Sequence, residues 1–357
     1  MLLHVVVQFE QWEDATMAKT TAAQRRLEAE LDVAEDLESC LVPRTHADDV
    51  ALKRRLSKGE IIMPASSVFI RSSRWQNLSR SDRALHLMRA LSEKHPSWVF
   101  RGSSAVLARG LEIPNEMVFP VKVYAGRSPA RASDLIEVAR PPKAFELKTE
   151  VLPDGIRVPT FWESVLECLL DAPFSKGLVV ADSALRRTGW TAGRLEECVR
   201  RTGRNRPGVR RAVLIARFAD GRAESGGESR IRAFFIEHGY RLPDLQVEIV
   251  DPVDSRRVFR VDFIWYLEDG RVIVGEFDGR CKFEDETMLL GRAPAEVFAQ
   301  AQQRESRLTL AGCEVLRFTY DDLVHPERLE RMLAVAGIPK DAGAERAWQR
   351  EWAGVQA

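Results

Sequence analysis

The stretch Arg260-Val-Asp-Phe-Ile-Trp-Tyr-Leu-Glu-Asp-Gly-Arg-Val-Ile-Val-Gly-Glu-Phe-Asp-Gly-Arg-Cys-Lys282 decides how the C-terminal part of this sequence folds. Its β-branched and aromatic residues predict two strands around a tight turn. If Glu268-Asp-Gly270 forms a three-residue loop with the glycine in the left-handed conformation, Asp262 lies opposite Glu276. A two-residue Asp-Gly turn is the alternative, and it would place these two acids on opposite faces of the hairpin.

The three-residue loop sorts the other side chains of the hairpin onto two faces. The face expected to be buried carries Val261, Phe263, Trp265, Ile273 and Phe277. The opposite face carries Asp262, Glu276 and Asp278 together with Ile264, Tyr266, Val272 and Val274. Opposed carboxylates repel each other unless one is protonated or a cation lies between them. The pattern therefore predicts that the three acids bind Mg²⁺ or Mn²⁺, which prefer hard oxygen ligands. Solvated acids on an exposed hairpin are the alternative.

The composition is typical of a soluble protein and names no partner. The 357 residues are enough for two or three domains, and 53 basic residues balance 53 acidic ones. The five cysteines show no zinc-site spacing, and their odd, unpatterned distribution favours a reducing compartment. No segment approaches the roughly 18 apolar residues of a membrane span, and residues 1–10 do not resemble a signal peptide. We therefore expect a cytoplasmic protein without a membrane partner, starting at Met1 or Met17.

The order of helical and strand-like segments predicts an α+β or α/β protein with three domains. Residues 19–75 contain a basic helix followed by a β-hairpin, which is the outline of a winged helix-turn-helix domain. Residues 76–205 predict a mixed middle domain, and residues 206–338 predict a central mixed sheet flanked by helices. We expect residues 1–18 to be a poorly ordered lead-in and residues 339–357 to be a polar tail.

The C-terminal segment resembles the PD-(D/E)XK restriction-endonuclease-like fold, and most closely its very-short-patch-repair branch. The resemblance rests on an acidic helix with Glu228, strands bearing Asp262 and Glu276-Phe-Asp278, and a following helix and strand. It implies hydrolysis of phosphodiester bonds with a divalent metal held by Asp262 and Glu276 and assisted by Glu228. Because Asp278 stands where the family usually has a lysine, Lys282 becomes the candidate catalytic lysine.

Three of the candidate residues have additional interpretations. Ser225-Gly-Gly-Glu228 matches a capping box, in which the glutamate fixes the start of a helix. Lys282 is also consistent with a solvated surface lysine. Arg304 belongs to the helix on which relatives of this fold place polar residues facing the site, and we take it as a candidate nucleic-acid contact.

A wider resemblance covers residues 48–330. The segments that carry it are Ser57-Lys-Gly59, Val68-Phe-Ile-Arg71, residues 102–110, residues 158–168 and residues 179–185. They are similar to actinobacterial proteins of the AbiEi-like antitoxin type, which couple a winged-helix head to a restriction-like tail. This implies that DNA is favoured over RNA as a ligand, with operator DNA or a toxin as the candidate partner.

Two basic clusters are candidates for contacts with a phosphate backbone, because Arg and Lys make such contacts. They comprise Lys53, Arg54, Arg55 and Lys58 beside the expected hairpin, and Arg200, Arg204 and Arg206 before the C-terminal domain. A solvated helix face and a solvated linker are the alternatives. The sequence thus predicts a metal-dependent DNA endonuclease or nickase. The alternative function is a DNA-binding regulator whose nuclease-like tail is catalytically inactive.

Overall fold

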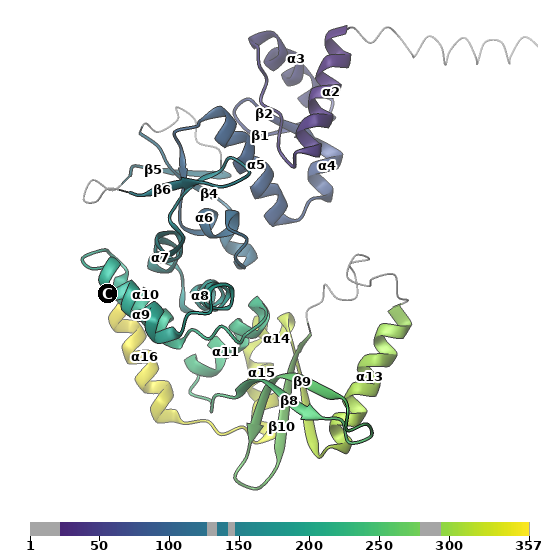
Figure 1. Ribbon diagram of the computed structural model, residues 1–357, viewed down its shortest axis with the longest axis vertical. Coiled ribbons are helices and arrows are strands. Elements are labelled where there is room, and N and C mark those ends of the chain that lie inside the picture. Colours follow the sequence, from purple (N-terminus) through teal and green to yellow (C-terminus); the bar gives the residue numbers. More distant parts are fainter. Residues whose placement is uncertain (1–21, 127–133, 142–146, 279–293, 357) are drawn as a thin grey trace, which may run out of the picture. The chain divides into compact units, whose positions relative to one another are not determined.

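The computed structural model describes residues 22–126, 134–141, 147–278 and 294–356 (Figure 1). These residues form a mixed α+β protein, as the sequence predicts, and the chain divides into two compact units. Unit 1 comprises residues 1–104 and 115–160, and unit 2 comprises residues 105–114 and 161–357. The expected lead-in at residues 1–18 lies outside the described residues. Within the described ranges, no helix is both long and apolar enough to cross a bilayer.

Unit 1 begins with two helices and a β-hairpin that share one core. These elements are α2 (Ala22–Asp36), α3 (His46–Leu56), β1 (Ile61–Ala65) and β2 (Val68–Arg71). Thr45 caps α3 by accepting a hydrogen bond from the amide of Asp48. β1 and β2 pair antiparallel, and an isolated bridge joins Leu41 to Phe69. Because Leu52 and Phe69 are fully buried in the shared core, α3 and the hairpin are held together by apolar packing.

The rest of unit 1 adds short helices and two small sheets. Its elements are α4 (Ser72–Asn77), α5 (Arg80–Lys94), β3 (Val99–Phe100), α6 (Gly102–Ala108), the 3₁₀ helix η1 (Asn115–Met117), β4 (Val121–Tyr124), β5 (Ile136–Ala139), β6 (Thr149–Val151) and β7 (Arg157–Pro159). β4 pairs antiparallel with β3 and parallel with β5, whereas β6 and β7 form a separate antiparallel pair. Helix α6 crosses from unit 1 into unit 2.

Unit 2 combines a helical layer with a four-stranded sheet. The helices are α7 (Phe161–Asp171), α8 (Phe174–Thr188), α9 (Ala192–Thr202), α10 (Val209–Phe218), α11 (Gly226–Glu237), α13 (Pro294–Leu310), α14 (Tyr320–Val324), α15 (Pro326–Ala336) and α16 (Ala342–Gln356). The strands are β8 (Asp244–Val250), β9 (Val258–Tyr266), β10 (Val272–Asp278) and β11 (Cys313–Thr319). The strand order is β11-β10-β9-β8, with β10 and β11 parallel and the other neighbours antiparallel.

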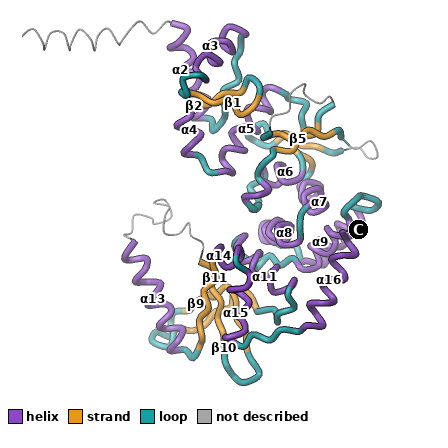
Figure 2. Tube along the Cα trace, turned by 180° about the vertical axis from the view of Figure 1, so that it is seen from behind, coloured by secondary structure: helices purple, strands orange, loops and turns teal. Residues whose placement is uncertain are grey.

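Helices cover both faces of this sheet. On one face Trp265 and Phe318 pack in a core with Phe235 of α11 and with side chains of α15. On the other face Val274 packs in a second core with Leu308 of α13. Figures 1 and 2 show the sheet between α13 and the pair α11 and α15. Burial on both faces explains why the strands are apolar at most positions, so that their few acids stand out.

Two boundaries differ from those that the sequence predicts. A boundary is predicted near residue 206, but the two compact units meet at residue 160. Helices α7 to α10 belong to unit 2 because α8 packs against both α10 and α11. Residues 339–357, expected to be a polar tail, instead form α16 over most of their length. Trp348 of α16 is 7% exposed and packs against Phe174 and Phe218, so buried aromatic surface fixes this helix despite its polar composition.

Candidate functional site

The register of the β9–β10 hairpin brings Asp262 and Glu276 together. Phe263 lies opposite Gly275, and the next pair in the same register is Asp262 and Glu276. Gly270 in the turn has a φ of +88°, which is the left-handed conformation that the three-residue loop requires. The predicted register is therefore confirmed, and the two-residue turn is wrong.

The alternation of inward and outward side chains breaks at this site. Val261 and Phe263 are two residues apart in β9, yet they belong to the cores on opposite faces of the sheet. Leu245 and Val247 divide between the same two cores in β8. Gln246 lies between them, opposite Asp262 of β9. Its φ is +55°, a conformation uncommon for residues other than glycine. The expectation that Val261 shares the face of Phe263 is wrong. In both β8 and β9 the side chains on either side of this position point to opposite faces of the sheet.

Asp262 is held by a backbone donor and a side-chain donor. Its Oδ2 accepts a hydrogen bond from the amide of Phe277 at 2.8 Å. Its Oδ1 accepts one from Nε2 of Gln246 at 3.4 Å, and the same Nε2 donates to Oε2 of Glu228 at 3.1 Å. One amide group therefore bridges two carboxylates that come from different elements of the fold.

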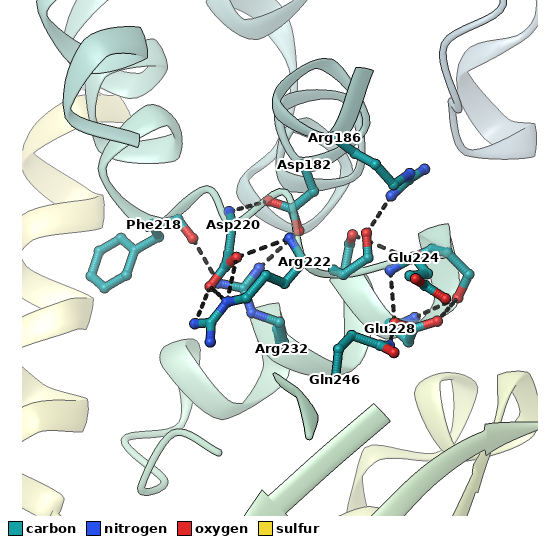
Figure 3. A network of polar contacts seen from close by, with 12 residues as sticks. Asp182, Arg186, Phe218, Asp220, Arg222, Glu224, Glu228, Arg232 and Gln246 are labelled. Carbon is teal, nitrogen blue, oxygen red and sulfur yellow. Dashed lines mark hydrogen bonds and ion pairs between the residues drawn. The ribbon is translucent and has the colours of Figure 1, made fainter. Parts of the chain in front are cut away.

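Glu228 lies in the first turn of α11 and is 6% exposed. The Ser225 hydroxyl accepts a hydrogen bond from the Glu228 amide at 3.2 Å and donates to Oε1 at 2.8 Å. Oε2 accepts from the amide of Glu224 at 2.8 Å as well as from Gln246 (Figure 3). The predicted capping role is confirmed, with the Glu224 amide in place of that of Ser225. Burial raises the pKa of Glu228, and the charge of Asp262 raises it further.

Glu276 faces α13, on the sheet face away from Trp265. Its side chain is 12% exposed, and its Oε1 lies 2.7 Å from Nη2 of Arg304. Burial raises the pKa of Glu276 to about 7. The attraction of Arg304 lowers this pKa, and the repulsion of Asp262 raises it. Near neutral pH this carboxyl group is therefore divided between its protonated and ionised forms.

Asp278 is also bound by an arginine. Its Oδ2 accepts a hydrogen bond from Nη1 of Arg317 at 2.8 Å, and Nε of Arg317 donates to Glu305 at 2.9 Å. A cavity of about 680 Å³ adjoins this pair and is lined by polar side chains of α13 that include Gln302 and Ser306. The Asp278 carboxylate is thus paired with Arg317. Lys282, the candidate catalytic lysine, lies outside the described residues.

The donor chemistry of the site suits a divalent cation, although its ligands are engaged elsewhere. Glu228, Asp262 and Glu276 offer only hard carboxylate oxygens, and Asp262 raises the pKa of both neighbours. In the part of the chain that the structure describes, no three His, Cys, Asp or Glu residues form a group able to hold a metal ion. Gln246 binds two of the carboxylates, and Arg304 binds the third. Their carboxylate oxygens are the kind that Mg²⁺ and Mn²⁺ prefer, but as arranged here they do not form a metal-binding group, and binding would require Gln246 and Arg304 to give way.

The predicted DNA contacts of unit 1 differ in pairing and in exposure. Nζ of Lys53 lies 2.6 Å from Oδ2 of Asp49, one helical turn earlier. Arg55 lies 2.8 Å from acids of α2 and of the loop before β1. Lys53, Arg54 and Lys58 are exposed, so all three are presented to a ligand, although Lys53 would have to leave its ion-pair partner.

The arginines between α9 and α10 differ in the same way. Arg206 is 16% exposed at its side chain and forms ion pairs with Glu163 and Glu167 of α7. Arg200 is 56% exposed and pairs with Glu196 of its own helix, and Arg204 is exposed. The segment that the sequence suggests as a linker is therefore fixed to α7 by Arg206, which leaves Arg200 and Arg204 as the exposed candidates.

The sequence gives no sign of two residues that shape the site. Gln246 is one of three polar residues in β8, and its backbone conformation depends on the sheet around it. Arg317 is one of several arginines in the C-terminal part of the sequence, and its pairing with Asp278 depends on the parallel β10–β11 register, in which Asp278 lies opposite Thr319. Only a prediction that β10 and β11 are neighbours could have suggested the contact between Asp278 and Arg317.

Two mycobacterial proteins similar to this chain are described as uncharacterized. No family model matches the sequence. The chain is 32% identical over 160 residues to an uncharacterized protein of Mycobacterium tuberculosis strain CDC 1551 and to one of strain H37Rv. The match covers 44% of this chain and 54% of each relative, so the chain spans about half the length of the curated relatives it matches.

Proposed function

We propose that this chain is a divalent-metal-dependent DNA endonuclease or nickase whose site comprises Glu228, Asp262 and Glu276. The observation that carries the proposal is that carboxylates from α11 and β10 lie within electrostatic reach of Asp262 in β9. Gln246 bridges two of these three groups, and Asp262 raises the pKa of the other two. Like charges buried together are unfavourable, and groups with such shifted pKa values concentrate at functional sites.

The carboxylates would have distinct roles. Asp262 and Glu276 would hold the cation, and Asp278 would join them if Arg317 released it. When bound, the cation would neutralise the charge that develops on the phosphoryl oxygens. Glu228 would assist by holding a proton at the edge of the site, since burial raises its pKa. Lys282 remains a candidate catalytic residue on the resemblance to the restriction-endonuclease-like fold.

The basic residues that remain exposed support DNA as the substrate. Arg54 and Lys58 lie on or beside α3, which precedes the β1–β2 hairpin, and this order of elements supports a winged-helix-like head in unit 1. Arg200 and Arg204 are exposed in unit 2. Exposed guanidinium and ammonium groups bind phosphates without regard to sequence, which suits a nuclease that approaches DNA through its backbone.

Metal-dependent stabilisation tests this proposal directly. At a Mn²⁺ concentration about 100 times the dissociation constant, binding adds about 2.7 kcal/mol of stability, or about 5–10 °C in the unfolding midpoint of a unit this size. Asp262→Asn should abolish the shift and plasmid cleavage. Its fold should survive, because the Asn oxygen can still accept from the Phe277 amide. Asp269→Asn is the matched control, since it removes an exposed acid at the far end of the same hairpin.

A DNA-binding regulator with an inactive tail is the second candidate. It is favoured by the two arginines that already neutralise Glu276 and Asp278. Such a protein, similar to AbiEi-like antitoxins, would bind operator DNA or a toxin and would bind DNA equally well in a chelator. If wild type and Asp262→Asn both ignore millimolar Mn²⁺ and DNA binding persists in EDTA, the nuclease proposal fails and the regulator replaces it.

A further inference from the structure

Arg304 is the positively charged partner of Glu276 in the described structure. Its Nη2 donates to Oε1 of Glu276 at 2.7 Å and also to the backbone oxygen of Arg260 in β9. Glu276 is 12% exposed at its side chain, whereas Arg304 is 35% exposed. The guanidinium therefore reaches a largely buried carboxylate from the solvent side, which leaves it a path to withdraw.

The backbone around Arg304 is anchored independently of this ion pair. Leu308, one turn later in α13, is 1% exposed and packs in the core formed with Val274 of the sheet. Arg307 pairs with Asp251, whose side chain is fully buried. Because these contacts hold α13 on the sheet, the Arg304 side chain can change partner without moving its helix.

The guanidinium of Arg304 has donors to spare. Both of its hydrogen bonds to described residues use Nη2. Its Nε is buried and has no hydrogen-bond partner in the described part of the chain. A buried donor without an acceptor is unfavourable, and a guanidinium with unused donors matches the oxygens of a phosphate.

We propose that Arg304 is an internal counter-ion that a divalent cation displaces from Glu276, and that the released guanidinium then binds a phosphate of the DNA backbone. This inference rests on the proposed nuclease function. Two positive charges cannot share one carboxylate oxygen without repulsion, so the arginine and the metal compete. Once displaced, the Arg304 side chain would remain tethered to α13 near Glu276, and its freed donors would bind a phosphate of the DNA backbone.

The two halves of this proposal predict effects of opposite sign. In Arg304→Gln, the affinity of the full chain for Mn²⁺ alone should rise about tenfold, because ~1.4 kcal/mol of competition is removed. Binding of a DNA duplex in Ca²⁺ should weaken, and the slope of log affinity against log salt should flatten by about one unit. A residue that merely supports the fold would weaken both. Calorimetry with Mn²⁺ and fluorescence anisotropy with the labelled duplex measure the two affinities.

Two further variants separate charge from structure. Arg271→Gln removes an arginine of similar exposure (39%) that pairs with acids near the hairpin turn, and it should change neither affinity. Arg304→Lys keeps the positive charge but loses the planar fork of donors, so its Mn²⁺ affinity should stay within about threefold of wild type while duplex binding weakens. If Arg304→Gln failed to fold, a tenfold rise in Mn²⁺ affinity for Arg304→Lys would still refute competition by charge.

The outcomes also distinguish this inference from the proposed function. Wild-type protein that binds Mn²⁺, with unchanged or weaker binding by Arg304→Gln, would refute the counter-ion role and leave the nuclease proposal standing. Binding by Arg304→Gln and not by wild type would support both, since the arginine would then hold the site closed to metal. If no variant binds Mn²⁺, the proposed function itself fails.

Discussion

Replacing Asp182 with alanine should destabilise unit 2 more than removal of any exposed ion pair in it. The Asp182 side chain in α8 is fully buried, and its Oδ2 lies 2.8 Å from Nη1 of Arg232 in α11. Its Oδ1 accepts a hydrogen bond from the amide of Asp220 at 2.7 Å. Arg232 also donates to the backbone oxygen of Phe218 at 2.8 Å, so the network in Figure 3 ties three segments of unit 2 together.

The expected loss follows from what the substitution leaves behind. Burial raises the pKa of Asp182 to about 6 despite the attraction of Arg232, so the carboxylate is ionised at pH 8. Asp182→Ala would leave a guanidinium only 8% exposed without its counter-ion, and breaking such a pair costs about 3–5 kcal/mol. This range includes the cost of leaving the Asp220 amide without its acceptor. Asp182→Asn keeps an acceptor for this amide and should cost about half as much.

Urea unfolding at pH 8, followed by the linear extrapolation of the free energy of unfolding, measures these losses. Arg222→Ala is the control: Arg222 pairs with Asp220 in the same network, but its side chain is 58% exposed, so its loss should cost at most about 1 kcal/mol. A loss below about 1 kcal/mol for Asp182→Ala would refute the reasoning, because it would mean that water or a rearranged side chain replaces the buried carboxylate.

Two further predictions concern burial in unit 2. Burial raises the pKa of Glu237 from 4.5 to about 7. The native state therefore keeps a proton that the unfolded chain has lost between these values, and stability falls as the pH rises from about 4.5 to 7. Asp182, Glu228 and Glu276 also have raised pKa values and contribute in part of the same window. Glu237→Gln should therefore reduce, without removing, the fall of unfolding free energy with pH in denaturation curves, and an unchanged slope would count against it. Gly227→Ala would place a methyl group against the Phe277 ring and should lower the unfolding free energy by about 1–3 kcal/mol; Gly193→Ala, whose methyl group meets open space on α9, should not.

The hairpin was predictable because its rules are local. The loop Glu268-Asp-Gly270 sets the register, and the register sets which acid meets which. The capping role of Glu228 was predictable for the same reason, since Ser225 lies three residues before it in the sequence. Each of these predictions needed only the residues within one turn or one hairpin.

The features that were not predictable depend on contacts between distant segments. Nothing in the sequence of β8 indicates that Gln246 takes a left-handed backbone conformation, which turns over two strands at the site. The segment containing Arg206 has the charge and glycine content of a solvated linker, yet the arginine pairs with acids more than 35 residues earlier in the chain. Local composition cannot reveal a partner that only the fold brings near.

The geometry of Glu228 also decides which substitution tests chemistry and which tests stability. Among the described residues, its carboxylate accepts three hydrogen bonds: from the Ser225 hydroxyl on Oε1, and from the Glu224 amide and Gln246 on Oε2. Glutamine at this position would offer one acceptor and would turn its own NH₂ group toward a donor. Glu228→Gln would therefore loosen the cap of α11 and the bridge to Asp262 at once, and lost activity would not separate the two causes. Asp262 accepts from the Phe277 amide at 2.8 Å and from Gln246 at 3.4 Å. Asp262→Asn can keep the Phe277 contact and loses only the longer one, so it removes charge without changing the cap of α11.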